Sequence, residues 1–259
     1  METTKTIIRS PQTGDQYTHI HHKSGLEILV CEMDGFSTTE AMFGTKYGSI
    51  NTQFKTAADS DYCTVPEGIA HFLEHKLFES EDGDAFERYS KTGASANAFT
   101  SFEYTCYLFS CTDKLEESLE ILLDFVQSPY FTEATVQKEQ GIIGQEIKMY
   151  DDDPQWRVMF NYLKAMYHSH PIQQDIAGTV ESISHITAET LYDCHKAFYT
   201  PSNMILTVVG NVDPVHVADL ARRILPREGG PAIPRDYGQE PAQVAAKETR
   251  MAMEVSAPQ

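Results

Sequence analysis

The chain has 259 residues, enough for one large domain or two small ones. Its 41% hydrophobic and 22% charged residues are ordinary for a globular protein, and its net charge of -18 argues against a nucleic-acid partner. No apolar run reaches the roughly 20 residues that cross a bilayer, and the N-terminus has no apolar core of signal-peptide length. Five cysteines without CxxC spacing fit reduced thiols. We therefore expect a cytoplasmic protein without a membrane partner.

The first third of the chain predicts strands followed by a helix. Residues 17–33 alternate around a Ser-Gly turn, which is typical of a β-hairpin, and residues 40–50 resemble a further strand. A polar loop over 51–65 leads into a helix that contains residues 67–76, with Pro66 at its first turn.

Helices and strands alternate through the rest of the chain. Aromatic, Thr and Cys residues over 95–111 predict paired strands, and 204–210 predicts a buried strand. Amphipathic patterns and capping residues predict the helices 82–92, 113–127 from Asp113, 132–150 capped by Thr132, one after Pro154, 187–199 from Thr187, and 213–225.

The composition changes near residue 226. Residues 1–225 are expected to form one domain, whereas the Gly- and Pro-rich stretch that follows is typical of a linker. The last residues, ETRMAMEVSAPQ, alternate like the first strand of a further domain. We therefore interpret 226–259 as a linker and the possible start of a second domain.

The segment EGIAHFLEHK, residues 67–76, carries a chemical motif. On a helix, His71, Glu74 and His75 share one face because residues three and four apart are neighbours. Two neutral imidazoles at this spacing can bind one Zn²⁺, and the glutamate can take a proton from metal-bound water. The spacing H-x-x-E-H is the inverse of the H-E-x-x-H motif.

A third metal ligand must come from elsewhere in the chain. Glu139 and Glu146 are seven residues apart on a predicted helix, which is two turns, so both lie on one face. One could bind zinc while the other holds a ligand histidine by a hydrogen bond. The alternative is a motif of solvated helix residues, but apolar neighbours surround it, and unpaired polar groups are costly there.

A wider set of motifs resembles one family. PEGIAHFLEHKLFE is similar to the zinc-binding signature of the pitrilysin/insulinase family, which includes the mitochondrial processing peptidases and their bacterial relatives. The resemblance covers about residues 15–225 and continues in family order through GASANAFTSFEYTCYLFS, QKEQGIIGQEI, MYDDDPQWR, HPIQQDIAGTVESISHIT and FYTPSNMILTVVGNVD.

The resemblance implies a fold and a reaction. The fold is α+β, a mixed and mainly antiparallel sheet with helices packed on one face. The reaction is zinc-dependent endopeptidase cleavage of extended peptides. His71, His75 and Glu146 are then the zinc ligands, Glu74 is the general base, and Glu139 supports a ligand histidine.

The resemblance also implies a substrate-binding strand. Asn97, Ala98 and Phe99 would lie on an edge strand that receives the peptide as an added strand. For Asn97 a turn or capping role is an equal alternative. His19 and His21 share a strand face and could suggest a second metal site, but without an accompanying carboxylate or cysteine a solvated face is favoured.

Two departures from the family pattern bear on function. Glu146 follows His75 by 71 residues, a few fewer than is common. Family members also carry two similar domains that close around the peptide, and this chain holds one. We therefore expect a second domain or subunit, or a homodimer. Two alternatives to an active peptidase remain: a non-catalytic partner or scaffold, and a half that acts only with a complementary chain.

Overall fold

The fold is built on one mixed sheet. A computed structural model describes residues 4–56, 59–81, 83–225 and 229–253, and within them the chain forms a seven-stranded sheet with the order β1-β2-β3-β11-β4-β10-β9. Only β3 and β11 pair in parallel there, which confirms the mainly antiparallel prediction. The strands are β1 (Thr4–Arg9), β2 (Gln16–His21), β3 (Glu27–Glu32), β4 (Thr39–Thr45), β9 (Ser95–Thr100), β10 (Thr105–Cys111) and β11 (Met204–Gly210).

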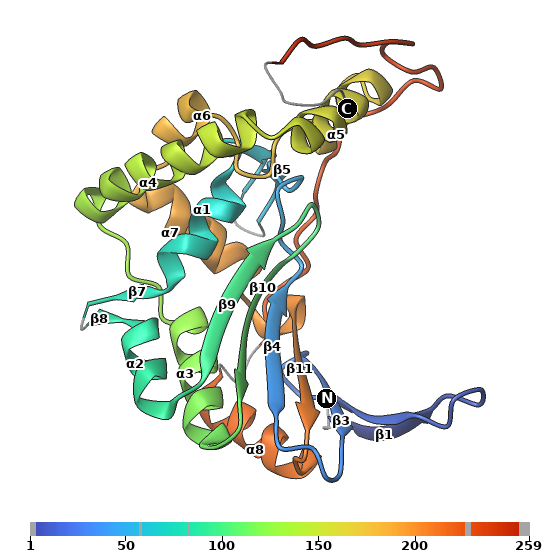
Figure 1. The fold of residues 1–259 in the computed structure, drawn as a ribbon, viewed down its shortest axis with the longest axis vertical. Coiled ribbons are helices and arrows are strands. Elements are labelled where there is room, and N and C mark those ends of the chain that lie inside the picture. Colours follow the sequence, from blue (N-terminus) through green and yellow to red (C-terminus); the bar gives the residue numbers. More distant parts are fainter. Residues whose placement is uncertain (1–3, 57–58, 82, 226–228, 254–259) are drawn as a thin grey trace.

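Helices cover one face of this sheet, as predicted (Figure 1). Helices α1, α2, α3 and α8 contact the strands directly, and α4 packs on α1, α5 and α6. Their bounds are α1 (Ile69–Leu77), α2 (Ala85–Thr92), α3 (Leu115–Gln127), α4 (Glu133–Asp151), α5 (Pro154–Met166), α6 (Val180–Ser184), α7 (Ala188–Phe198) and α8 (Pro214–Ile224), with 3-10 turns η1 (Pro171–Gln173) and η2 (Pro201–Asn203).

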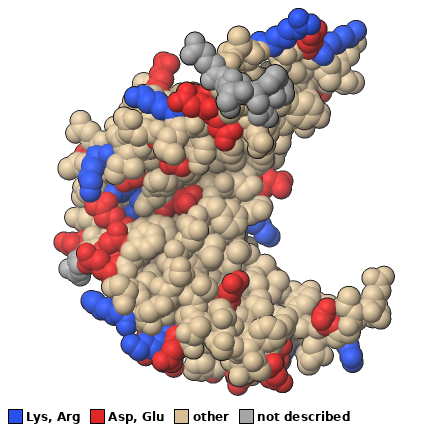
Figure 2. Space-filling model, viewed as in Figure 1, with Lys and Arg blue, Asp and Glu red and all other residues tan. Residues whose placement is uncertain are grey.

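The two faces of the sheet differ in burial. Phe43, Phe109 and Leu206 are fully buried beneath the helices, whereas Met42 and Val209, which alternate with buried neighbours, are more than one-third exposed on the other face. The molecule is C-shaped, with the β1–β2 hairpin at one tip and α5 at the other, and mostly uncharged residues face the hollow (Figures 1 and 2).

Strand β1 and two short pairs were not predicted. Every residue of β1 is exposed, so TKTIIR has no inward face and no alternation marks it as a strand. The predicted hairpin 17–33 is confirmed as β2 and β3, and the strand expected over 40–50 ends at Thr45. The predicted loop 51–65 contains the pair β5 (Gln53–Phe54) and β6 (Cys63–Thr64); β7 (Glu79–Ser80) and β8 (Gly83–Asp84) form another.

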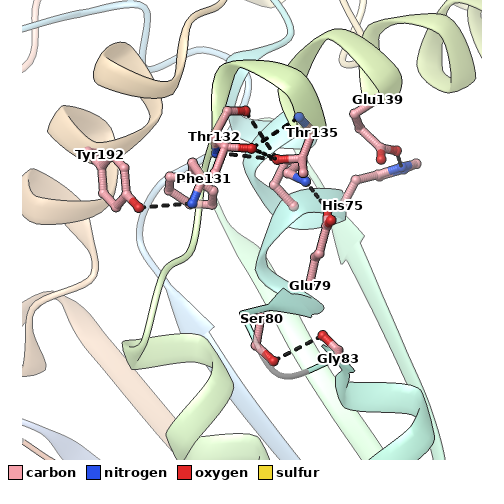
Figure 3. A network of polar contacts seen from close by, with 10 residues as sticks. His75, Glu79, Ser80, Gly83, Phe131, Thr132, Thr135, Glu139 and Tyr192 are labelled. Carbon is pink, nitrogen blue, oxygen red and sulfur yellow. Dashed lines mark hydrogen bonds and ion pairs between the residues drawn. The ribbon is translucent and has the colours of Figure 1, made fainter.

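Most helix starts follow the predicted capping residues. Thr132 caps α4 in a capping box with Thr135 (Figure 3). Thr187 caps α7 in the same way. The prediction for Asp113 is wrong, because α3 begins at Leu115 after Lys114, which has a left-handed backbone with φ 51°.

Helix α1 also begins later than predicted. Pro66 lies ahead of its first turn, and Gly68 precedes Ile69 with φ 85°. A Cβ on Gly68 would lie 2.3 Å from the carbonyl oxygen of Ala177, so this position needs glycine for both its conformation and its close approach.

The segment predicted to be a linker packs against the domain. Arg235 forms a β-bridge with Phe54, and the Asp236 amide donates to the carbonyl of Gln53. The carboxylate of Glu240 accepts hydrogen bonds from the backbone amides of residues 168–170. Residues 248–253 are not in a strand, and the remainder of the predicted strand, 254–259, lies outside the described residues. Among the helices that the structure describes, none is both long and apolar enough to cross a bilayer.

Candidate metal centre

Helix α1 is buried on almost all sides, which places its polar residues in the interior. His71 and Glu74 are 8% and 7% exposed, and Ile69, Phe72 and Leu73 pack into the core beside them. Polar groups are costly at such depth unless they have partners, so the contacts of these side chains decide what the helix can do.

His71 and His75 direct their Nε2 atoms at one carboxylate. Nε2 of His71 is 3.6 Å from Oε1 of Glu146, and Nε2 of His75 is 3.5 Å from Oε2. Both separations exceed a normal hydrogen bond. They match the roughly 3.3–3.6 Å between neighbouring ligands of a tetrahedral zinc with bonds of about 2.0–2.2 Å. One ligand atom from each residue lies within 4.8 Å of the other two, so this donor set fits a zinc ion.

Glu139 contacts the ring nitrogen of His75 that does not face Glu146. Its Oε1 lies 3.0 Å from Nδ1 of His75. This contact, drawn in Figure 3, orients the ring with Nε2 toward Glu146. Burial alone would lower the pKa of His75, but the bond to Glu139 and the charges of Glu74 and Glu146 outweigh burial and raise it. The two glutamates seven residues apart thus take different positions, with Glu146 between the histidines and Glu139 outside them.

Two neighbours hold the carboxylate of Glu146 in its ionised form. The His71 ring contributes most to lowering the pKa of Glu146 to about 2, and the hydroxyl of Tyr150, which donates to Oε1 at 2.9 Å, adds to it. Burial and the carboxylate raise the pKa of Tyr150 to about 12, so this phenol keeps its proton. On the other side, Nδ1 of His71 is buried and has no hydrogen-bond partner among the described residues.

Glu74 faces the same space as the three candidate ligands. Its Oε2 accepts a hydrogen bond of 2.5 Å from Oγ1 of Thr100, at the end of β9. A cavity of about 340 Å³ joins these groups, lined by His71, Glu74, His75, Asn97, Ala98, Phe99, Thr100, Glu146, Tyr150, Trp156, Ile176 and Ala177. A carboxylate beside a metal-ligand set in one cavity is suited to move protons in a hydrolytic reaction.

Strand β9 is the edge of the large sheet, next to this cavity. Asn97, Ala98 and Phe99 lie in its middle, paired on one side with β10. Asn97 accepts a hydrogen bond from the Ala98 amide and lies within the strand rather than in a turn or cap. The position of these residues fits an edge that could accept a further strand, while their contact with a peptide stays a prediction.

Five lining residues were not among the predicted site residues: Thr100, Tyr150, Trp156, Ile176 and Ala177. Tyr150 follows Glu146 by one helical turn, so helical spacing could have identified it. Trp156 reaches the cavity from α5 and Thr100 from β9, and no local pattern brings these positions together.

The His19–His21 pair does have an acidic partner. Both rings contact the carboxylate of Glu27, which lies on the neighbouring strand β3. The expectation that no carboxylate accompanies them is therefore wrong, because strand register brings Glu27 beside them from another part of the sequence. Hydrogen bonds from the two histidines lower the pKa of Glu27 despite its partial burial, which acts in the opposite direction.

Comparison with known proteins places this geometry in a family. The family described as "Insulinase (Peptidase family M16)" matches residues 63–180, and "Peptidase M16 inactive domain" matches residues 185–257. The chain is 53% identical over 248 residues to a protein of Bacillus subtilis named "Uncharacterized zinc protease YmfH", and it covers 58% of that protein with 94% of its own length. A protein of Mycobacterium leprae named "Uncharacterized zinc protease ML0855" is 33% identical over 189 residues, which are 71% of this chain and 42% of the relative.

Solved structures show the same fold. An Alicyclobacillus acidocaldarius protein described as an M16-like peptidase aligns with a TM-score of 0.83 and 39% identity, over 95% of this chain and 56% of the other. Pitrilysin aligns with a TM-score of 0.72 and 19% identity, over 88% of this chain and 25% of its own, a likeness of fold alone. The chain spans little more than half the length of the Bacillus subtilis and Alicyclobacillus acidocaldarius proteins. Two M16 family models match the chain, and a relative named as a zinc protease is similar to it over nearly the whole length of this chain. This chain therefore belongs to the M16, or insulinase, family of peptidases.

Proposed function

We propose that this chain is the zinc-binding part of a metalloendopeptidase that cleaves extended peptides. The observation that carries the proposal is the meeting of His71, His75 and Glu146 in one cavity with the carboxylate of Glu74. In this assignment residues 1–225 are the catalytic domain and residues 226–259 lead toward a second domain.

Each residue has a defined task. His71, His75 and Glu146 hold the ion, and Glu139 fixes the ring of His75. A bound zinc would polarise the scissile carbonyl and bring the pKa of a coordinated water to about 7. Glu74 takes the proton of the attacking water and delivers it to the leaving amine, because it is the carboxylate in the cavity that is not between the histidines.

The edge strand β9 supplies the substrate-binding surface in this proposal. A peptide that pairs with Asn97, Ala98 and Phe99 would extend the sheet and lie along the cavity. Backbone pairing selects an extended chain with little demand on its side chains. We infer that a second domain or subunit, or a second copy of this chain, closes over the open face, where Met42 and Val209 are exposed.

Metal analysis combined with a cleavage assay tests the proposal. We expect one zinc per chain by elemental analysis, and much less in Glu146→Gln. Cleavage of a quenched fluorescent peptide library should be lost in Glu74→Gln while its zinc content is unchanged. Glu103→Gln, an acidic residue outside the cavity lining, is the matched control and should behave as the parent chain.

The outcomes separate the alternatives. Zinc without cleavage would mean that the centre assembles but needs the second half of the protein. No zinc in a folded chain that has never met a chelator would rule out the peptidase and favour a scaffold.

A further inference from the structure

A chain of contacts beyond the histidines begins at the carboxylate of Glu146. Tyr150 lies one turn further along α4 and donates its hydroxyl hydrogen to Oε1 of Glu146 at 2.9 Å. The same oxygen is the one that faces Nε2 of His71. The hydroxyl therefore acts on a candidate ligand atom directly, from outside the ligand set.

Trp156 fixes the ring of Tyr150. The two rings are stacked with centroids 4.6 Å apart and an interplanar angle of 19°. Trp156 in turn donates its Nε1 hydrogen to Oδ2 of Asp175 at 2.6 Å. Since an indole has a single donor, this bond sets the rotation of the Trp156 ring, and the stacking passes that constraint to Tyr150.

Asp175 begins a loop that also contacts the histidine helix. Its Oδ1 accepts the amide hydrogen of Ala177, and its carbonyl accepts that of Gly178. The carbonyl of Ala177 packs so closely on Gly68 that a Cβ there would lie 2.3 Å away. The loop thus contacts the start of α1, which carries His71 and His75, and holds Trp156, which reaches Glu146 through Tyr150.

From these contacts we propose that Tyr150, locked by Trp156 and Asp175, is a positioning residue that fixes the Glu146 carboxylate for metal binding. The inference rests on the proposed metal centre and adds a determinant of its affinity. A glutamate side chain has three rotatable bonds, and the Glu146 side chain is 26% exposed. Without the hydroxyl it would sample rotamers that do not face the histidines, so part of the binding free energy would be used to order it.

The affinity of the chain for zinc tests whether Asp175 and Trp156 act on Glu146 through Tyr150, and this test does not need catalysis. We would measure zinc dissociation constants of the full 259-residue chain by competition with a chromophoric chelator. Tyr150→Phe removes the hydroxyl and keeps the ring, and we expect zinc binding about tenfold weaker, the lower end for groups that support metal ligands. Trp156→Phe keeps an aromatic ring but loses the bond to Asp175, and an effect of about fivefold is expected. Tyr162→Phe, at an exposed tyrosine on α5, is the matched control and should not change affinity.

A double variant shows whether Trp156 acts through Tyr150 or whether the two residues have separate packing effects. Because Trp156 acts through Tyr150, Tyr150→Phe with Trp156→Phe should bind zinc within about twofold of Tyr150→Phe alone. The unfolding midpoints of the metal-free proteins should stay close to that of the parent, and the visible spectrum of the Co²⁺-loaded protein should change in Tyr150→Phe.

The inference would be overturned by the following results. Unchanged affinity in Tyr150→Phe, in a parent chain that binds zinc, would remove Tyr150 from any positioning role. Multiplied effects in the double variant, or losses that follow a lower metal-free unfolding midpoint, would assign Trp156 to packing. A parent chain without zinc would overturn the metal centre itself, which is a separate failure.

Discussion

At the scale of single residues, Thr100 links the candidate base to the candidate peptide-binding strand. Its hydroxyl donates to Oε2 of Glu74 at 2.5 Å, and it ends β9 directly after Asn97, Ala98 and Phe99. Thr105 lies opposite it on β10, and its hydroxyl bonds the carbonyl of Tyr47. Thr100 is therefore held by the sheet, and it holds Glu74 within the cavity.

Removing this hydroxyl should impair turnover without removing metal. In Thr100→Val the shape of the side chain stays, but Glu74 loses its donor and can rotate away from the attacking water. We expect kcat to fall about tenfold with KM and zinc content little changed, because a small misplacement of a catalytic group is costly. Thr100→Ser, which restores a hydroxyl, should recover most of the rate. Equal rates for the valine and serine variants would show that the hydrogen bond has no part in catalysis.

Helical spacing explains how the sequence could group candidate site residues that the structure brings close together. His71, Glu74 and His75 share a face by their spacing of three and four, and Glu139 and Glu146 by their spacing of seven. Lys76, on the same helix, is fully buried and pairs with Glu79. A lysine in the sequence predicts an exposed side chain, and here the packing of other parts of the chain around α1 buries it.

At the scale of elements, helices with side-chain caps were predicted best. Thr132 and Thr187 identify their helix starts because Thr at the cap bonds the third backbone amide, a purely local interaction. Strand β1 and the start of α1 escaped prediction because distant parts of the chain define them. Strand β1 depends on pairing with β2, and Gly68 depends on the loop at Ala177.

Helix α7 carries a buried histidine that should make stability depend on pH. His195 is 8% exposed, and its Nε2 hydrogen is donated to the carbonyl of Val126 at 2.9 Å. Burial lowers the pKa of His195 to about 4, and the bond to Val126 opposes this only in part. The folded protein therefore keeps this ring neutral under conditions where the unfolded chain, with a pKa of 6.5, binds a proton.

The sign of the effect follows from that difference. Between pH 6.5 and about 4 the unfolded state binds more protons, so the contribution of His195 to the free energy of unfolding falls as the pH falls. From pH 7.5 to pH 5 this loss is about 2 kcal/mol. His195→Gln cannot gain a charge and keeps a donor for Val126. In urea unfolding with chelator present, the parent should lose about 2 kcal/mol more than the variant between these pH values. Equal losses would contradict a neutral buried His195.

At the scale of the whole molecule, the described chain is a domain with one covered and one open sheet face. Its relatives are longer, since it covers 58% of the Bacillus protein and 56% of the Alicyclobacillus structure. The hollow side of the C shape lies between the β1–β2 hairpin and α5 (Figure 2). The family resemblance implied the general fold class. The arrangement of the tail, residues 229–253, could not be predicted, because contacts such as those of Glu240 with residues 168–170 join positions 70 or more apart.

The tail holds the loop that leads to the metal centre. The carboxylate of Glu240 accepts the amides of residues 168–170 at 2.8, 2.6 and 2.5 Å, and Tyr237 stacks on the ring of His170. This loop continues through η1 to Asp175, which bonds Trp156. Trp156 stacks on Tyr150, and Tyr150 bonds Glu146. Three amides bonded to one carboxylate form a strong anchor, since charge-assisted hydrogen bonds exceed neutral ones in strength.

Removing the anchor should free those amides. In Glu240→Ala we expect hydrogen exchange of the amides of residues 168–170 to quicken about tenfold, because local opening no longer breaks three charge-assisted bonds. Glu248→Ala is the matched control: its carboxylate lies in the same tail and pairs with Arg250, so exchange at residues 168–170 should match the parent. Hydrogen exchange followed by mass spectrometry measures both. If Glu240→Ala left these amides as protected as in the parent, the tail would only lie against the domain, and the loop before Asp175 would owe its order to its own turn and to η1.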